Sequence, residues 1–199
     1  MTANRKVIID TSALICFTEI RRDVDVFGCL RSIFGQVLVP TEIKAEYERG
    51  TAKEPQRNWL LERLRPNVGF YALCTRYDSI VLAMLQNIKG IDAGEAEAVA
   101  QYNKAGAYYI LTDDARFANS IKAVHPDIRV ISSLHIIALI EFNRLLPDCQ
   151  PLKKKIHAKL NYKSKHLREA YIYIAKDLGL SLTGKDISKK TSLKTILSE

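Results

Sequence analysis

A short apolar run that ends in an aspartate lies close to the start of the chain. Residues 7–9 are Val-Ile-Ile, and Asp10 follows them directly, before the hydroxyl residues Thr11 and Ser12. An apolar run of β-branched residues is typical of a strand buried on both faces of a parallel sheet. Asp10 then lies at the carboxyl end of this strand, where open α/β sheets place their ligand crevice. A carboxylate buried there requires a positive charge nearby.

Strand-like and helix-like segments alternate along the first 146 residues. Apolar runs predict further strands at residues 37–39, 68–74, 107–111 and 128–131. Apolar residues at spacings of three and four, with cap and breaker residues around them, predict helices at residues 25–34, 58–64, 79–88, 92–104, 115–124 and 133–146, and one opening at Pro40-Thr41. This alternation, joined by short loops, predicts an α/β fold with a parallel sheet flanked by helices on both faces.

A second predicted strand also ends in acidic residues. Residues 107–111 run into Thr112, Asp113 and Asp114. Carboxyl ends of parallel strands meet at one edge of a sheet, so these acids are expected near Asp10. Asp114 is equally suited to capping the helix that follows, and that simpler reading stays open.

Two predicted helices begin with glutamates. Glu42 and Glu46 lie four residues apart on one helix face, where like charges repel mildly. Asp92 and Glu95 have the spacing of a capping box, which explains Glu95 without any chemistry. If these helices start at the same edge of the sheet, their acids join those that follow the strands.

Acids gathered at one edge would repel one another unless a divalent cation joined them. Oxygen ligands without His or Cys favour Mg²⁺ or Mn²⁺ over zinc. Such a cation lowers the pKa of bound water and clamps a phosphate oxygen, which is the chemistry of phosphodiester hydrolysis. The four histidines do not form a catalytic pair and are expected to be structural or solvated: His125, His135, His157 and His166.

Excess positive charge is concentrated at the end of the chain. Of the formal net charge of +8, residues 147–199 contribute +7, from 12 Lys+Arg against 5 Asp+Glu. A near-neutral body joined to a basic tail suggests a polyanionic partner, although a merely solvated tail is the simpler alternative. Two helical stripes are predicted in this extension, and we expect them to pack against the body or a second subunit, whereas residues 184–199 look loosely ordered.

The remaining composition indicates a globular protein of the cytoplasm. The chain has 199 residues, of which 47% are hydrophobic, and no apolar run approaches the roughly 20 residues that cross a bilayer. The four cysteines are scattered without a CxxC pair, which favours reduced, buried thiols over a zinc site or disulfides. No membrane association is expected.

Four blocks together resemble the PIN domain family, in its toxin-like branch. They are VIIDTSALI, VLVPTEIKAEYERG, DAGEAEAVAQY and YYILTDDARFA, and they occur in the family's order between residues 7 and 146. The resemblance implies a three-layer PIN-like fold and a Mg²⁺- or Mn²⁺-dependent nuclease, usually an endoribonuclease that leaves 5′-phosphate and 3′-hydroxyl ends. It divides the chain into a PIN-like domain, residues 1–146, and a basic, mainly helical extension, residues 147–199.

The resemblance also assigns the acids. Asp10, Glu46, Glu95 and Asp114 match the family's acidic positions and are the implied catalytic and metal-binding residues. Asp113 is an implied further ligand or substitute.

Neighbouring residues receive implied roles as well. Glu42 is the less favoured ligand on its helix, and Glu97 is a rival to Glu95 that should face elsewhere. Three hydroxyls would orient carboxylates or water: Thr11, Ser12 and Thr112. Basic residues of the extension are expected to face RNA: Lys153, Lys154, Lys155, Lys159, Lys163, Lys165 and Arg168.

Other classes fit less well. A haloacid-dehalogenase-type enzyme needs an aspartate at position 12, where this chain has Ser12, and a Rossmann enzyme needs a glycine-rich first turn. The serious alternative is a non-catalytic RNA-binding or protein-interaction module that retains the fold. As partners the resemblance implies an RNA substrate, an antitoxin and a second copy of the chain.

Overall fold

A six-stranded parallel sheet forms the middle of the molecule. The computed structural model describes residues 5–51, 58, 61–66, 70–88, 90–192 and 196. The strands are β1 (Lys6–Ile9), β2 (Gln36–Pro40), β3 (Arg65–Pro66), β4 (Tyr71–Cys74), β5 (Ala107–Leu111) and β6 (Val130–Ile131). Their order is β3-β4-β2-β1-β5-β6, and all neighbouring strands pair in parallel. The predicted parallel sheet is confirmed, with β1 next to both β2 and β5.

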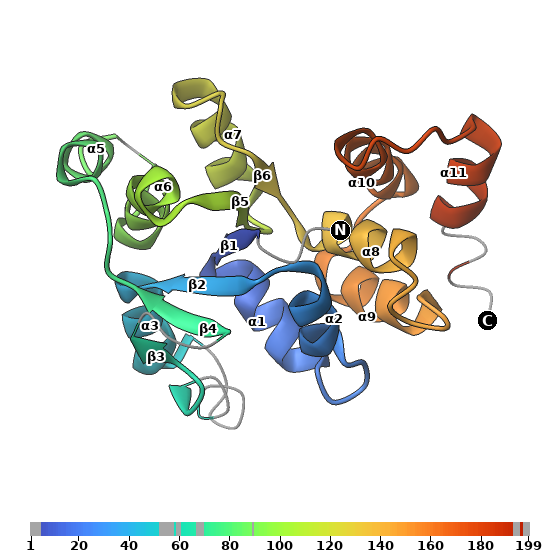
Figure 1. Ribbon diagram of the computed structural model, residues 1–199, viewed down its shortest axis with the longest axis horizontal. Coiled ribbons are helices and arrows are strands. Elements are labelled where there is room, and N and C mark those ends of the chain that lie inside the picture. Colours follow the sequence, from blue (N-terminus) through green and yellow to red (C-terminus); the bar gives the residue numbers. More distant parts are fainter. Residues whose placement is uncertain are drawn as a thin grey trace.

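Helices cover both faces of the sheet (Figure 1). They are α1 (Thr11–Ile20), α2 (Val26–Ile33), α3 (Thr41–Glu46), η1 (Tyr47–Thr51), α5 (Ser79–Leu85), α6 (Ala93–Ala105), α7 (Ala115–Val124), α8 (Ser133–Phe142), α9 (Gln150–Leu160), α10 (Ser164–Asp177) and α11 (Gly184–Thr191). One buried cluster joins the sheet to α1, α2 and α8–α10, and another joins it to α5–α7. The fold therefore has three layers, as predicted.

Alternating side chains of β1 belong to the two different clusters. Val7 and Ile9 pack on the side of α1 and α8, whereas Ile8 packs on the side of α6. All three are 0% exposed. This is why the strand reads as an uninterrupted apolar run and not as an alternating one.

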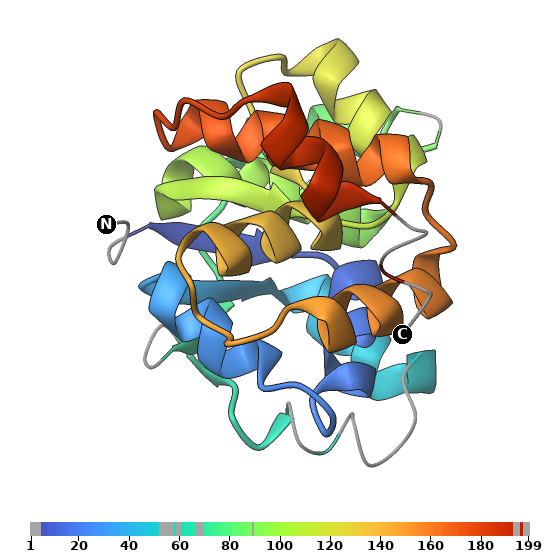
Figure 2. The ribbon, with the colours of Figure 1, turned by 90° about the vertical axis from the view of Figure 1, so that its right-hand side faces the viewer.

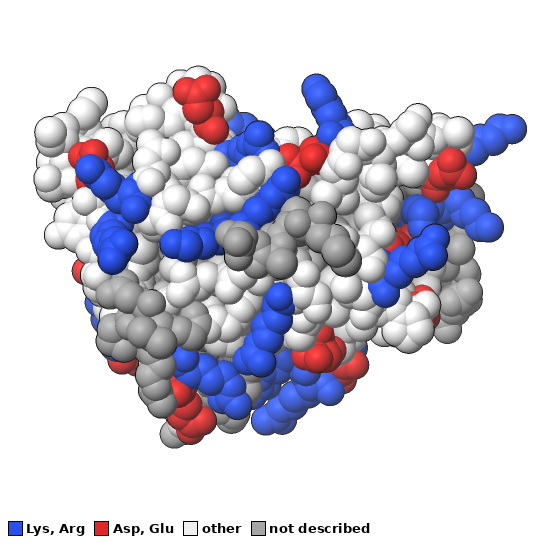
Figure 3. All heavy atoms as spheres, viewed as in Figure 1, with Lys and Arg blue, Asp and Glu red and all other residues white. Residues whose placement is uncertain are grey.

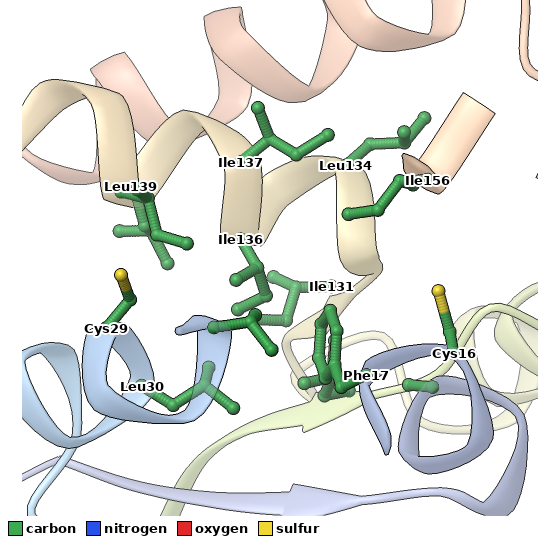
Figure 4. Close-up of a cluster of buried hydrophobic side chains, with 14 of the residues drawn as sticks. Cys16, Phe17, Cys29, Leu30, Ile131, Leu134, Ile136, Ile137, Leu139 and Ile156 are labelled. Atoms are coloured by element: carbon green, nitrogen blue, oxygen red, sulfur yellow. The ribbon is translucent and has the colours of Figure 1, made fainter. Parts of the chain in front are cut away.

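Helix α8 is buried on two sides. Figure 4 shows Ile131 of β6 and Ile136 of α8 pointing towards the helices that carry Phe17 and Leu30, whereas Ile137 points the other way. The seven buried residues of α8 include Ile136 and Ile137. A helix that is apolar all round needs cover on both sides, and the C-terminal helices supply the second side.

The C-terminal helices pack against the body, as the apolar stripes predicted. Leu152, Ile156, Leu167 and Ile174 are 0% exposed and belong to the same cluster as β1. Figure 2 shows α9 lying alongside α1, with α10 and α11 above α8, and contacts join α9 to α1 and α10 to α8. These helices complete the core of the PIN-like body.

Several boundaries differ from the predictions. Residues 184–199 were predicted to be loosely ordered, which is wrong for α11 because its Ile187 is buried in the core. Residues 193–195 and 197–199 lie outside the described part. Strand β4 begins only at Tyr71, and the predicted helix at 58–64 lies partly outside the described residues. The π-helical η1 was not predicted. Within the described residues, no helix has the length and apolarity that crossing a membrane would require.

Candidate functional site

Asp10 lies at the carboxyl edge of the sheet, between β1 and α1. Its N–H donates to the carbonyl oxygen of Leu111 (2.9 Å), which aligns the ends of β1 and β5. Its Oδ2 accepts hydrogen bonds from Ser12 Oγ (2.6 Å), Thr112 Oγ1 (2.9 Å) and Ser12 N (3.3 Å). Asp10 is thus the N-cap of α1 and is only 8% exposed. The hydroxyls of Ser12 and Thr112 hold the carboxylate in one orientation.

Glu46 reaches the same edge from the last residue of α3. Its Oε2 accepts a hydrogen bond from Thr11 Oγ1 at 2.7 Å, so Thr11, which directly follows Asp10, orients the Glu46 carboxylate. Burial raises the pKa of Glu46, and the charges of Asp92 and Asp10 raise it further, whereas the hydrogen bond from Thr11 lowers it. The π-helical turn η1 starts directly after Glu46, a type of irregularity that is frequent at functional sites.

Glu95 reaches the edge from the first turn of α6. It forms the predicted capping box with Asp92: the Glu95 N–H donates to Asp92 Oδ1 (2.8 Å) and the Asp92 N–H to Glu95 Oε2 (3.0 Å). Burial raises the pKa of Glu95 from 4.5 to about 7, although the hydrogen bond from Asp92 lowers it; the charges of Asp92, Asp10 and Asp114 raise it further. Glu95 therefore both caps α6 and lies close to the other acids.

Glu97 does not belong with these acids. It is buried, and its carboxylate accepts hydrogen bonds from the Glu42 N–H (2.7 Å), Gln101 Nε2 (3.0 Å) and the Thr41 hydroxyl. Glu97 therefore ties α6 to the start of α3, and the expectation that it faces elsewhere than Glu95 is met. Glu42 itself is exposed.

Asp113 and Asp114 divide two roles between them. Both oxygens of Asp113 accept hydrogen bonds from Ser133, from its N–H (2.8 Å) and its Oγ (2.6 Å), so this carboxylate fixes the start of α8. Burial raises the pKa of Asp113, and the charge of Asp10 contributes to the increase. Asp114 caps α7 by accepting from the N–H groups of Arg116 (2.7 Å) and Phe117 (3.0 Å) through a single oxygen, Oδ1.

We call this set the acidic edge: Asp10, Glu46, Asp92, Glu95, Asp113 and Asp114. Its members come from the ends of two strands and the ends of two helices. Burial raises the pKa values of Glu46, Glu95 and Asp113, and the charge of Asp10 contributes to all three increases. Asp92 was predicted as a cap but not as a neighbour of Glu46. Gly94 was also missed: a Cβ at this position would lie 3.1 Å from Glu46 Oε1, so the glycine lets α6 approach α3. Sequence spacing gives no signal for either contact.

The donor set of the acidic edge fits a hard cation by its chemistry. Its ligands are carboxylate oxygens that are partly desolvated and mutually repelling, which Mg²⁺ or Mn²⁺ would relieve. Within the described residues, however, no three His, Cys, Asp or Glu side chains stand in the arrangement of a metal-binding group. Occupation would therefore require these side chains to turn from their caps towards a common point.

Histidines take no part in the acidic edge. Burial lowers the pKa of His135 to about 4, and its Nδ1 accepts from the Ser132 N–H at 3.0 Å in the cap of α8. His125 is the C-cap of α7, and His157 packs edge-on against Tyr162. These positions agree with the prediction that each histidine is structural or solvated.

The basic residues that were predicted to face RNA lie in different environments. Lys153 is a correction: it is 3% exposed, and its ammonium lies 2.6 Å from Glu141 Oε2, so it is not available to a ligand. Ion pairs also join Lys155 to Asp23 and Lys159 to Glu19. The remaining predicted residues are exposed or half-buried: Lys154, Lys163, Lys165 and Arg168. Figure 3 shows Lys and Arg spread over one face of the molecule and not gathered in one patch.

The chain is thus an α/β protein with a parallel sheet, and the acids at the carboxyl edge of that sheet form its candidate site. The chain belongs to the PIN domain family, because a family model described as a PIN domain matches residues 6–184. The match reaches into α11 and so includes α9 and α10. No curated protein matches the chain significantly. Membership supports a nuclease-type fold and hydrolase chemistry in general.

Proposed function

We propose that the chain is a Mg²⁺- or Mn²⁺-dependent endoribonuclease. The observation that carries this proposal is the acidic edge, where Glu46 and Glu95 are both at least partly buried and both lie close enough to Asp10 for its charge to contribute to their raised pKa values. Keeping several desolvated carboxylates together destabilises the folded chain, and such groups cluster at functional sites. The family supports the same chemistry, since PIN domains are nuclease-type folds.

Four residues would hold the metal: Asp10, Glu46, Glu95 and Asp114. Bound there, the ion would supply charge neutralisation and a water of lowered pKa beside the scissile phosphate. Thr11 keeps the Glu46 carboxylate in place, and Ser12 and Thr112 do the same for Asp10. Asp113, held by Ser133, positions the loop that carries Asp114.

Comparison of the wild-type protein with Asp10→Asn on total RNA tests this proposal. Asparagine retains the N-cap of α1 but removes the charge. We expect Mn²⁺-dependent cleavage by the wild type, no cleavage in EDTA, and a loss in the variant larger than the ~10–100-fold typical of groups that only support a ligand. A matched control is Asp25→Asn, which changes an aspartate that caps α2 and should leave cleavage unchanged.

Two results would contradict the proposal. Equal cleavage by wild type and Asp10→Asn would remove the acidic edge as the site, and cleavage that persists in EDTA would remove the metal. Binding of Mn²⁺ without cleavage of any RNA would favour the alternative, a non-catalytic RNA-binding or protein-interaction module.

The toxin-like blocks extend the proposal to biology. We propose that the nuclease acts in the cytoplasm as the toxin of a toxin–antitoxin pair, pairs with a second copy of itself, and is inhibited by an antitoxin segment laid across the acidic edge. Growth arrest on expression, absent with Asp10→Asn, is the expected result. A native protein that is isolated alone, fully active and harmless to its host would contradict this extension.

A further inference from the structure

A pocket of about 470 Å³ lies at the amino ends of β5 and β6, at the opposite edge of the sheet from the acidic edge. Its lining comes from these strand ends and from the last turns of α10: Tyr108, Arg129, Tyr173, Lys176 and Asp177. Along β5, Tyr108 and Thr112 are separated by about 13 Å at the usual rise of a strand. This amino-edge pocket is therefore a different site from the acidic edge.

Positive charges outnumber negative ones around the amino-edge pocket. Asp177, the one carboxylate of the lining, pairs with Arg5 at 3.0 Å and with Arg129 at 2.8 Å. The Tyr108 hydroxyl donates to the same carboxylate at 3.1 Å. Lys176 adds a further positive charge and is exposed. Two arginines and a lysine against one aspartate leave an excess of positive charge, which attracts an anion.

Arg129 has donors to spare for such an anion. A single nitrogen, Nη1, forms both its contact with Asp177 and its hydrogen bond to the Tyr108 hydroxyl. Within the part of the chain that the structure describes, Nε and Nη2 have no acceptor, and 44% of the side chain is exposed. The guanidinium also lies over the Tyr108 ring, 4.4 Å from its centre. A guanidinium held in this way with one edge free can bind a phosphate through two parallel hydrogen bonds.

Tyr173 supplies an aromatic surface beside these donors. The ring is 38% exposed, and the His135 ring packs edge-on against it with 5.2 Å between ring centres. The ion pairs of Asp177 fix the end of α10, one turn beyond Tyr173. An aromatic ring that is held in place but open to solvent can stack on a planar ligand, and every nucleobase offers such a face.

A nucleotide matches this combination of groups better than a simpler anion does. Inorganic phosphate would use the cations and leave the aromatic surface without a contact. The volume of the pocket falls within the roughly 300–1,000 Å³ of pockets that bind small ligands. A nucleotide brings both groups together, because its phosphate and its base are joined through one ribose.

We propose that the amino-edge pocket binds a nucleotide, with the phosphate on Arg129 and Lys176 and the base stacked on Tyr173. A free nucleoside 5′-monophosphate and the first nucleotide of a 5′-phosphorylated RNA strand present these same groups. The inference goes beyond the proposed cleavage, since none of the three side chains belongs to the acidic edge.

Titrations of the full-length protein in EDTA test the pocket, because the metal-free acidic edge repels a phosphate. Calorimetry compares adenosine 5′-monophosphate with adenosine, which lacks the phosphate. We expect the monophosphate to bind roughly 10- to 150-fold more tightly, the range for hydrogen bonds to a charged group. Arg129→Lys keeps the charge beside Asp177 but loses the forked donors, so it should lose most of this preference. Tyr173→Leu should weaken binding of the monophosphate roughly 5- to 150-fold, the range for one base–aromatic stack.

Two short RNAs of one sequence, with a 5′-phosphate or a 5′-hydroxyl, distinguish the two sources of the nucleotide. Tighter binding of the phosphorylated RNA than of adenosine 5′-monophosphate would identify the end of a strand as the ligand. Binding of the monophosphate with no difference between the two RNAs would identify the free nucleotide.

Matched controls change the same surface or charge outside the pocket. Ile172→Ala alters an exposed neighbour of Tyr173, and Lys185→Ala removes an exposed charge from α11. Both variants should bind adenosine 5′-monophosphate like the wild type. Equal binding of adenosine and its monophosphate, unchanged binding of the monophosphate by Arg129→Lys and Tyr173→Leu, or no binding of the monophosphate or the phosphorylated RNA would overturn the inference.

Discussion

Two sets of carboxylates in this molecule lie in opposite environments. At the acidic edge, Asp10 and Glu46 accept hydrogen bonds from hydroxyls and N–H groups, and burial together with the charges of Asp92 and Asp10 raises the pKa of Glu46. Away from it, Glu141 and Asp177 meet lysines, arginines and tyrosines. Burial acts to raise the pKa values of this second pair too, but their hydrogen bonds and ion pairs lower them overall.

The two sets of carboxylates therefore differ in purpose: one set stabilises the packing of helices, and the other forms the candidate site. Glu141 and Asp177 hold the C-terminal helices against the body, so their charges are balanced within the chain. The acidic edge keeps its charges where a cation from outside would balance them. Neutralising one carboxylate of each set should therefore affect different properties, which the following predictions use.

The largest effect on stability is expected for Glu141→Gln. Lys153 is 3% exposed and lies 2.6 Å from Glu141 Oε2, so the variant leaves a buried ammonium without its counter-charge. We expect the free energy of unfolding to fall by about 3 kcal/mol, the lower end for breaking a buried pair, because the carbonyl oxygen of Lys190 remains an acceptor. Denaturant melts measure this. Glu48→Gln, which breaks the exposed pair with Lys44, should change it by less than about 0.5 kcal/mol.

Measuring RNA cleavage by Glu141→Gln and by Asp10→Asn completes the comparison of the two sets of carboxylates. Glu141→Gln should retain wild-type cleavage per folded molecule, whereas Asp10→Asn should retain the fold and lose cleavage. If Glu141→Gln unfolded like the wild type, the ion pair would contribute nothing to docking of the C-terminal helices. The contrast between the two sets of carboxylates would then fail.

A smaller effect is expected for Glu95→Gln, and it depends on pH. The pKa of Glu95 is raised from 4.5 to about 7, so the folded chain holds this proton more tightly than the unfolded chain. Its contribution to stability is therefore present below pH 4.5 and is lost as pH rises towards 7. Gln retains the capping box without the charge, so the metal-free variant should be more stable than the wild type by about 1–3 kcal/mol at pH 8.

Melts at pH 5 and pH 8 without divalent metal check this prediction. The advantage of Glu95→Gln should shrink towards pH 5, and added Mn²⁺ at pH 8 should stabilise the wild type more than the variant. An advantage equal at both pH values would mean that Glu95 is not held in a repulsive environment. Glu141 has the opposite sign: its lowered pKa contributes stability that is lost as pH falls through that pKa.

Local patterns in the sequence were sufficient to predict the parallel sheet and the capping contacts of acids within one segment. The apolar run before Asp10 and the one before Thr112 predicted two buried strands, because burial on both faces leaves a direct signature; that these strands are neighbours was found only in the structure. The pairing of Asp92 with Glu95 was equally visible, since a capping box is a contact three residues apart.

Contacts between distant segments were not predictable in the same way. Lys153 was expected to face RNA, yet it is buried against Glu141, because its environment is set by how α8 and α9 pack. The engagement of both Asp113 oxygens by Ser133, and so the different roles of Asp113 and Asp114, depends on where α8 starts relative to β5. Charge patterning along one helix holds no information about the helix that will cover it.

The smallest effect on stability, with a selective effect on cleavage, is expected for Gly94→Ala. The new Cβ would lie 3.1 Å from Glu46 Oε1 and 3.2 Å from Ile43 Cγ1, so the Glu46 carboxylate must shift by a few tenths of an ångström. Alanine favours a helix by up to about 1 kcal/mol, which offsets the crowding, so unfolding should change by less than about 1 kcal/mol. Cleavage should fall by about 10–100-fold, as for groups that orient a metal ligand. Gly184→Ala, at an open position in the first turn of α11, is the control and should leave cleavage unchanged. Equal cleavage by both variants would show that the close approach of α6 to Glu46 is not needed at the acidic edge.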